Sequence, residues 1–212
     1  MMGGGGKMRG GSTDPNSWEN FRGLGLTDTE LMGLATFNDP NRADCASCHS
    51  LTPGPGGRPL FTNFGYDNLG IPRNPDNLAS ASDPNWVDLG LGAVLKDASQ
   101  DGKFKVPTLR NVDLRPSAGF VKAYGHNGYF KSLPEIVMFY SWRGMMMGGG
   151  MMGGGDTGGQ MGGGGMGGGM GMDMFPAPEV NRNLAPLNHF SMMDQSNIVA
   201  FLKTLSDGYF KR

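Results

Sequence analysis

The feature that most constrains this chain is the pentapeptide Cys45-Ala46-Ser47-Cys48-His49, which contains both of its cysteines. C-x-x-C-H is the attachment sequence of c-type haem. Two thiols three positions apart can bond to the two vinyl groups of one porphyrin, and the histidine that follows can bind the iron from the proximal side. The motif therefore predicts one covalently bound haem c, attached through Cys45 and Cys48 and ligated by His49.

Other uses of two neighbouring cysteines fit the surrounding sequence less well. A thioredoxin-like pair would follow a strand in a βαβ unit, whereas residues 38–41 and 53–56 are rich in Pro, Gly, Asn and Asp and indicate loops. A zinc site would need His126 and His189 as further ligands, at spacings that match no compact zinc module. A disulfide between such close cysteines would close a very short loop and stabilise little.

Two glycine-rich and methionine-rich segments set the expected domain organisation. The 212 residues include 38 Gly and 17 Met, concentrated in residues 3–11 and 144–171. Glycine-rich chain has few side chains to bury and a large ordering entropy. We therefore expect a flexible tail over residues 1–17, a cytochrome c domain in two parts (18–143 and 175–212), and a disordered insertion over 144–174.

Charge and hydropathy exclude two classes of partner. The net charge is −1 and no Lys/Arg cluster is present, so nothing favours binding to nucleic acid. No apolar run approaches the roughly 20 residues that span a bilayer, so no transmembrane segment is expected. The N-terminus reads Met-Met-Gly-Gly-Gly-Gly and lacks the apolar core of a signal peptide, so the chain as written carries no export signal.

The regular structure is expected to be helical, and the fold class all-α. Thr27 and Glu30 form a capping box before an apolar run at helical spacing, which leads into the haem motif. Ser132-Leu133-Pro134-Glu135 opens a second helix, and residues 197–205 form a third that Gly208 closes. Residues 50–84 are rich in Pro, Gly and Asn, and predict ordered loop without regular structure that can wrap a haem edge.

Several blocks of sequence, in the same order, resemble a known family. They are Gly33-Leu34-Ala35-Thr36-Phe37-Asn38, residues 59–64 and 67–75, Phe104-Lys105-Val106-Pro107-Thr108-Leu109-Arg110-Asn111-Val112, residues 126–128 and 132–140, and residues 176–180 and 198–205. These blocks are similar to the C-terminal haem domain of bacterial di-haem cytochrome c peroxidases, a family that includes the enzymes that mature methylamine dehydrogenase. The resemblance covers about residues 24–144 and 175–209.

The resemblance implies half of a di-haem enzyme. Family members usually carry two C-x-x-C-H motifs and this chain has one, so the domain with the peroxide-reacting haem is missing. In the family the C-terminal haem mainly collects electrons and passes them on. We therefore expect a periplasmic or other extracytoplasmic electron-transfer module, whose redox partners are a small periplasmic electron donor and a second haem protein or domain.

The sixth iron ligand decides what such a haem can do. Tyr140 falls where the peroxidases place their methionine, and it matches the tyrosine ligand of the methylamine dehydrogenase maturation enzymes. Met138 lies two residues earlier, on a different face of the helix. His126 lies in a turn, and the matching family histidine is near the haem. Tyr140 is the favoured ligand, His126 is a further haem-binding candidate, and the alternatives are Met138, Met145, Met146 and Met147.

Two other functions stay open. If the sixth iron position is free, the haem could react with hydrogen peroxide directly, alone or with a second haem domain, as a cytochrome c peroxidase-like oxidoreductase. The methionine-rich insertion could bind Cu(I), because thioether sulfur is a soft ligand. In that case the chain would be a metal-binding or assembly module with the haem as its anchor. The same methionines could also trap oxidants near the haem.

Overall fold

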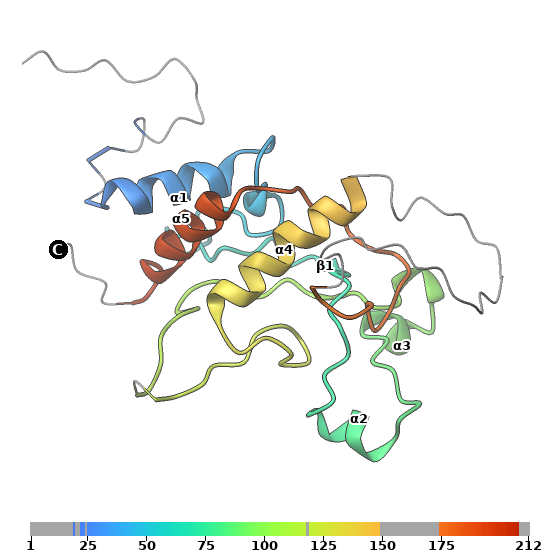
Figure 1. The fold of residues 1–212 in the computed structure, drawn as a ribbon. Helices are drawn as coiled ribbons and strands as arrows, with labels where there is room; N and C mark the ends of the chain where they lie inside the picture. Colours follow the sequence, from blue (N-terminus) through green and yellow to red (C-terminus); the bar gives the residue numbers. More distant parts are fainter. Residues whose placement is uncertain (1–18, 20–21, 24, 118, 149–173, 208–212) are drawn as a thin grey trace, which may run out of the picture.

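The computed structural model describes residue 19 and residues 22–23, 25–117, 119–148 and 174–207 (Figure 1). The tail predicted over 1–17 and residues 149–173 of the predicted insertion lie outside the described residues. In chain order the elements are α1 (Asp28–Asn38), η2 (Cys45–Ser47), β1 (Tyr66–Asp67), α2 (Leu78–Ser82), α3 (Leu91–Leu95), η3 (Ala98–Gln100), β2 (Phe104–Lys105), α4 (Leu133–Gly148) and α5 (Met192–Lys203).

Helices α1 and α5 pack side by side (blue and red in Figure 1). Each begins with a capping box, Thr27 with Glu30 in α1 and Ser191 with Asp194 in α5. The helices touch at Gly33, where a Cβ atom would lie 2.0 Å from the carbonyl oxygen of Asn197. The predicted first helix is thus confirmed. The last helix begins five residues earlier than predicted and ends at Lys203, and Gly208 lies outside the described residues.

Helix α4 carries the predicted sixth ligand and packs against α5. Pro134 stands in its first turn, and the hydroxyl of Ser132 accepts a hydrogen bond from the backbone N–H of Glu135 at 3.3 Å. Val137 and Phe139 are buried, and Ile136 and Tyr140 are partly buried against the same core. The helix continues to Gly148 and so includes residues 144–148 of the segment predicted as an insertion.

Sheet structure is minimal in the described residues. β1 and β2 form an antiparallel pair in which Asp67 faces Phe104. The all-α expectation therefore holds in its coarse form, as a mainly helical chain with little sheet. The expectation that residues 50–84 hold no regular structure was wrong, because β1 and α2 lie there. Helix α2 forms because the side chain of Asn77 accepts a hydrogen bond from the N–H of Ala79 and so caps it.

Aromatic side chains join the helices to the loops. Phe61, from the loop after the C-x-x-C-H motif, packs edge-on against Phe37 of α1 and Phe201 of α5, with ring centroids 6.3 Å away in each case. A second group of buried rings lies along α4 and consists of Phe130, Phe139, Trp142 and Phe175. None of the described helices has the length and apolar character needed to cross a membrane.

Candidate haem-attachment site

The C-x-x-C-H motif folds into a single helical turn. Residues 45–47 form η2, and the N–H of His49 donates to the carbonyl of Cys45 at 2.8 Å. Both cysteines are free thiols. Burial, aided by nearby Asp44, raises the pKa of Cys45 to about 12, and burial likewise raises the pKa of Cys48. The pair is therefore protonated at neutral pH, unlike the low-pKa cysteine of a thioredoxin-like motif.

His49 is buried and held in one orientation. Its Nδ1 atom lies 2.9 Å from the carbonyl oxygen of Phe61. A carbonyl can only accept a hydrogen bond, so Nδ1 carries the proton and the lone pair of Nε2 is left for a metal. Burial lowers the pKa of His49, against the opposing effect of the carbonyls of Phe61 and Pro107. The imidazole is thus neutral at pH 7, which is the form that binds iron.

The loop of residues 60–65 brings the carbonyl of Phe61 to His49. Phe61 has φ of 54°, in the left-handed region that a non-glycine residue rarely adopts. On one side the N–H of Asn63 donates to the carbonyl of Cys48 at 2.8 Å. On the other side the hydroxyl of Thr62 donates to the carbonyl of Val106 at 2.7 Å. The loop is therefore fixed between the motif and the strand β2 region, and the unusual backbone occurs at the residue that orients the histidine.

Tyr140 of α4 lies close to the two thiols. Burial raises the pKa of its hydroxyl, and the negative charges of Cys45, Cys48 and Asp67 would raise it further. Asp67 of β1 also belongs to this cluster, because the thiol of Cys48 lies 3.5 Å from its carboxylate. The thiols of Cys45 and Cys48, the hydroxyl of Tyr140 and the carboxylate of Asp67 thus lie within electrostatic range of one another.

The alternative methionine ligands lie elsewhere or are not described. Met138 and Met146 are partly buried and pack against the hydrophobic core. Met145 is 46% exposed. The side chain of Met147 lies outside the described part of the structure. Tyr140 is also partly buried against this core, and its hydroxyl interacts electrostatically with both thiols.

His126 occupies a separate site. Its ring stacks on Phe104, with centroids 3.5 Å apart, and its Nε2 lies 3.9 Å from the carboxylate of Glu179. Burial lowers the pKa of His126 to about 4, against an opposing effect of Asp88. At 3.9 Å the contact is too long for a hydrogen bond, so burial outweighs the attraction of Glu179. No described contact links His126 to the thiols, and haem binding by His126 stays a prediction.

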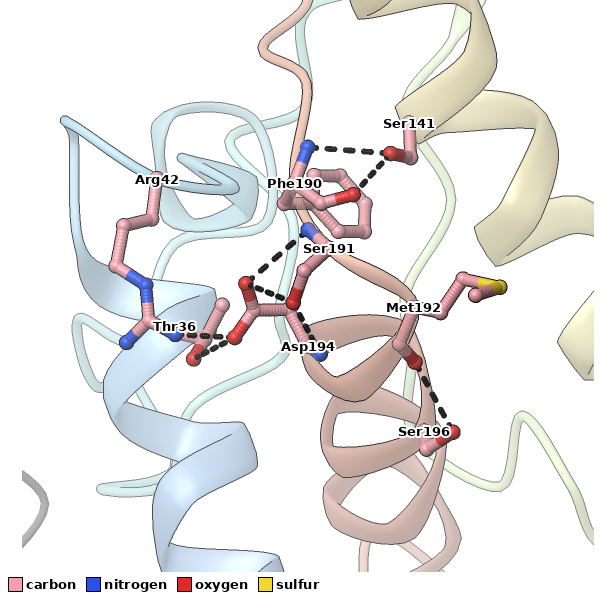
Figure 2. Close-up of polar contacts among 8 residues, drawn as sticks. All are labelled: Thr36, Arg42, Ser141, Phe190, Ser191, Met192, Asp194 and Ser196. Carbon is pink, nitrogen blue, oxygen red and sulfur yellow. Dashed lines mark hydrogen bonds and ion pairs between the residues drawn. The ribbon is translucent and has the colours of Figure 1, made fainter.

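A polar network joins the helix of Tyr140 to the loop that precedes Cys45 (Figure 2). The hydroxyl of Ser141 donates to the carbonyl of Phe190 at 2.5 Å and accepts from its N–H at 3.1 Å. One residue later, Ser191 caps α5 together with Asp194. Asp194 also pairs with the guanidinium of Arg42, three residues before Cys45. The start of α5 is therefore bonded both to α4, which carries Tyr140, and to Arg42, which precedes the C-x-x-C-H motif.

The zinc alternative is not supported. No group of three or more His, Cys, Asp or Glu side chains that could hold a metal ion occurs in the part of the chain that the structure describes. His189, the other potential ligand, lies instead 3.1 Å from the hydroxyl of Ser141. The thiols therefore have one histidine neighbour in their own turn, His49, which is the arrangement that haem attachment requires.

Comparison with known proteins identifies relatives of this chain. It is 35% identical over 191 residues to the methylamine utilization protein MauG of Paracoccus denitrificans, a match that covers 86% of this chain and 43% of MauG. It is 30% identical over 142 residues to the cytochrome-c peroxidase IdrP2 of Pseudomonas sp., covering 59% of this chain and 33% of that protein. The chain thus spans less than half the length of these relatives. No protein-family model matches it.

Solved structures of related proteins also match this chain over most of its length. The diheme peroxidase BthA of Burkholderia thailandensis superimposes with a TM-score of 0.60 at 31% identity, over 87% of this chain and 44% of BthA. A MauG-like protein associated with microbial copper homeostasis shares the fold, with a TM-score of 0.52 at 22% identity, over 86% of this chain and 45% of that protein. The described fold therefore matches part of a di-haem peroxidase.

Proposed function

Because this chain is homologous over most of its length to MauG and the di-haem cytochrome c peroxidases, we propose that it is the electron-collecting half of such a protein. It would correspond to the C-terminal haem domain, with one covalently attached haem c. Its cytochrome domain would have two parts, separated by the methionine-rich insertion, and the first part would extend to the end of α4 at Gly148 and not stop at residue 143. The haem would supply reversible one-electron chemistry at its iron.

The observation that carries this proposal is that His49 is neutral, with the lone pair of Nε2 available, in the same turn as two free thiols. The thiols of Cys45 and Cys48 would form thioether bonds to the haem, and Nε2 of His49 would bind its iron. The carbonyl of Phe61 keeps the proton on Nδ1 and thus keeps Nε2 available. Such hydrogen bonds to a ligating histidine fix its tautomer and raise its basicity. The donor set of this turn therefore fits a c-type haem.

We favour Tyr140 as the sixth ligand, because its hydroxyl interacts electrostatically with both thiols. Met138 lies two positions earlier on α4, and both residues are partly buried against the core. In the polypeptide the hydroxyl keeps its proton because burial raises its pKa, so ligation as tyrosinate would need the positive charge of ferric iron to release it. A tyrosinate favours oxidised iron and fills the position at which peroxide would react. This supports an electron carrier over a peroxide-reacting site.

The partners follow from this role. We propose that a small periplasmic protein donates electrons to this haem, and that a second haem protein or domain receives them. The second haem domain would supply the half of MauG or of a di-haem peroxidase that this chain does not match. We place the protein in the periplasm or another extracytoplasmic compartment for the same reason.

The reaction with hydrogen peroxide tests the proposed role. We expect the haem-loaded wild type to consume hydrogen peroxide slowly and to accept electrons rapidly from a small reduced cytochrome c. Tyr140→Ala should open the sixth position and raise the rate of peroxide consumption at least tenfold. Met138→Ala is the matched control, with an unchanged rate. Fast peroxide consumption by the wild type, unaltered by Tyr140→Ala, would identify a peroxidase and contradict the proposal.

A further inference from the structure

The described surface contains an open groove with a volume of about 580 Å³. Residues of the segments 58–64 and 105–110 line it, together with Asp207. Its apolar side chains include Leu60 and Phe64, which are 39% and 57% exposed. Exposed apolar side chains among polar ones are a common feature of surfaces that bind another protein. The groove is therefore a candidate interaction surface.

Phe64 is held in one place although its ring is exposed. Its φ is 61°, in the left-handed region that bulky residues rarely adopt. Its N–H donates to the hydroxyl of Thr62 at 3.0 Å, and the ammonium of Lys105 lies 5.0 Å from the centre of its ring. Earlier in the loop, the carbonyl of Leu60 accepts from the hydroxyl of Thr108 at 2.6 Å. A ring on a fixed backbone loses little entropy when a partner covers it, and unusual backbone of this kind clusters at functional sites.

The groove carries an excess of positive charge. Its lining includes the cations Arg58, Lys105 and Arg110, and one carboxylate, that of Asp207. Asp207 pairs with Arg110. Neither Arg58 nor Lys105 takes part in an ion pair among the described residues. Because the whole chain has a net charge of −1, this excess is local, and it attracts a partner with an acidic surface.

The wall of the groove is connected to the candidate iron ligand. Leu60 and Thr62 line the groove, and the carbonyl oxygen of the residue between them, Phe61, lies 2.9 Å from Nδ1 of His49. Along this path, one residue of backbone and one hydrogen bond separate a partner in the groove from the imidazole. Electrons pass more readily along covalent bonds and a hydrogen bond than across solvent. The groove is therefore well placed for electron entry through His49.

We propose that this groove is the docking surface for the electron donor, a small redox protein whose own docking face carries carboxylates around an apolar centre. The inference rests on the function proposed above. The carboxylates of the donor pair with Arg58 and Lys105, and its apolar centre covers Leu60 and Phe64. Few apolar side chains and an excess of charge fit a transient redox complex, because permanent interfaces are larger and more apolar. A second haem domain, as a permanent partner, is expected to contact another surface.

The test measures how fast the haem-loaded protein is reduced in stopped-flow experiments. The probe is photoreduced flavodoxin, a small acidic redox protein whose flavin supplies the electron. Free photoreduced riboflavin is the reference reductant, because it carries the same flavin ring without a protein surface. Covalent haem content is measured first for every protein, as the pyridine haemochrome.

Two kinds of variant separate the charge of the groove from its apolar part. The double variant of Arg58→Glu with Lys105→Glu reverses the two unpaired charges, and Lys96→Glu is the matched control at an exposed lysine outside the groove. Phe64→Asn removes the exposed ring and keeps the left-handed backbone, which asparagine adopts readily. Phe120→Asn is its control, because Phe120 is 47% exposed and does not line the groove.

We expect the wild-type rate constant with flavodoxin to fall as the ionic strength rises, because opposite charges attract the partner. At low ionic strength the double variant should be slower by about tenfold or more and should lose this salt dependence. Phe64→Asn should be several times slower and keep the salt dependence. Lys96→Glu and Phe120→Asn should match the wild type, and free riboflavin should reduce every variant at the wild-type rate.

If the double variant is slowed no more than Lys96→Glu, the donor docks elsewhere and the inference is wrong. A wild type that riboflavin reduces and flavodoxin does not, or whose rate with flavodoxin does not fall with ionic strength, would also contradict it. A dimer that Phe64→Asn dissociates, measured by analytical ultracentrifugation, would show that a second copy of this chain covers the groove instead. A wild type without covalent haem would overturn the proposed function itself.

Discussion

The Nδ1 atom of His49 lies 2.9 Å from the carbonyl oxygen of Phe61, while the ring of Phe61 packs between α1 and α5. One residue thus connects the candidate iron ligand to the helical core. Its backbone faces the site and its side chain faces the core, so the orientation of His49 depends on the packing of the whole domain.

Thr62→Val should disturb this relationship without removing a ligand. The hydroxyl of Thr62 donates to the carbonyl of Val106 at 2.7 Å and accepts from the N–H of Phe64 at 3.0 Å, so it fixes the loop that presents the carbonyl of Phe61. We expect a loss of about 1–3 kcal/mol in the free energy of unfolding, measured by urea denaturation. The midpoint potential should rise, because a weaker bond at Nδ1 makes the imidazole less basic.

Thr52→Val is the control for this variant, because Thr52 is exposed in the same loop region. It should leave both the stability and the potential unchanged. A Thr62→Val protein with the stability and potential of the wild type would show that the loop does not hold His49 through this hydroxyl.

Ser141→Ala should weaken the attachment of α4 to the start of α5. The variant leaves the buried N–H and carbonyl of Phe190 without the partner that Figure 2 shows, and an unsatisfied buried group costs about 1–3 kcal/mol. Ser196→Ala is the matched control, because the exposed hydroxyl of Ser196 only bonds to the carbonyl of Met192 within the same helix. Equal urea midpoints for the two variants would contradict the structural role assigned to Ser141.

His126 should make the protein less stable in mild acid. Because the folded pKa is about 4 and the ordinary value is 6.5, the unfolded chain binds a proton between these values that the folded chain does not. Stability is therefore retained above about pH 6.5 and is lost as the pH falls towards 4. From about pH 7.5 to about pH 5 the loss should be about 2 kcal/mol.

His126→Phe should remove this loss, since a phenyl ring can keep the stack on Phe104 without titrating. Urea denaturation of both proteins at the two pH values measures the difference. The carboxyl groups of Asp88 and Glu179 near His126 are common to both proteins, so their own titration affects both curves. A difference in stability between wild type and variant that is the same at both pH values would show that His126 is not the titrating group.

The sequence predicted those parts of the site whose chemistry depends on side-chain type and spacing. Cys45, Cys48 and His49 could be identified because covalent attachment and iron ligation need those groups at fixed positions. Tyr140 could be identified from the resemblance. Phe61 could not be identified as the partner of His49, because its contribution is a backbone carbonyl and any residue supplies one. The burial of the Arg143 guanidinium could not be predicted either, because it depends on tertiary packing.

The local helix signals predicted α1 and the start of α4, but they missed the start of α5, the end of α4 and the short helices α2 and α3. Helix α5 begins at Met192, five residues before the predicted start. The prediction missed this first turn because Met192 and Met193, which are 82% and 71% exposed, are apolar residues outside the buried face and break the apolar periodicity. Ser191 and Asp194 do form a capping signal in the sequence, and it would have placed the start correctly. Helix α2 is a five-residue helix with one buried residue, Ser80, and so has no apolar pattern to detect.

Covalent haem attachment is the central claim, and the pyridine haemochrome spectrum tests it most directly. The protein is produced in cells that attach haem to exported c-type cytochromes, and the spectrum is recorded for the wild type, for Cys48→Ala and for Ser47→Ala as a control within the motif. The account predicts one haem with two thioether links in the wild type and in Ser47→Ala, and the loss of the two-thioether spectrum in Cys48→Ala. A wild type without covalent haem, or a Cys48→Ala spectrum identical to that of the wild type, would contradict it.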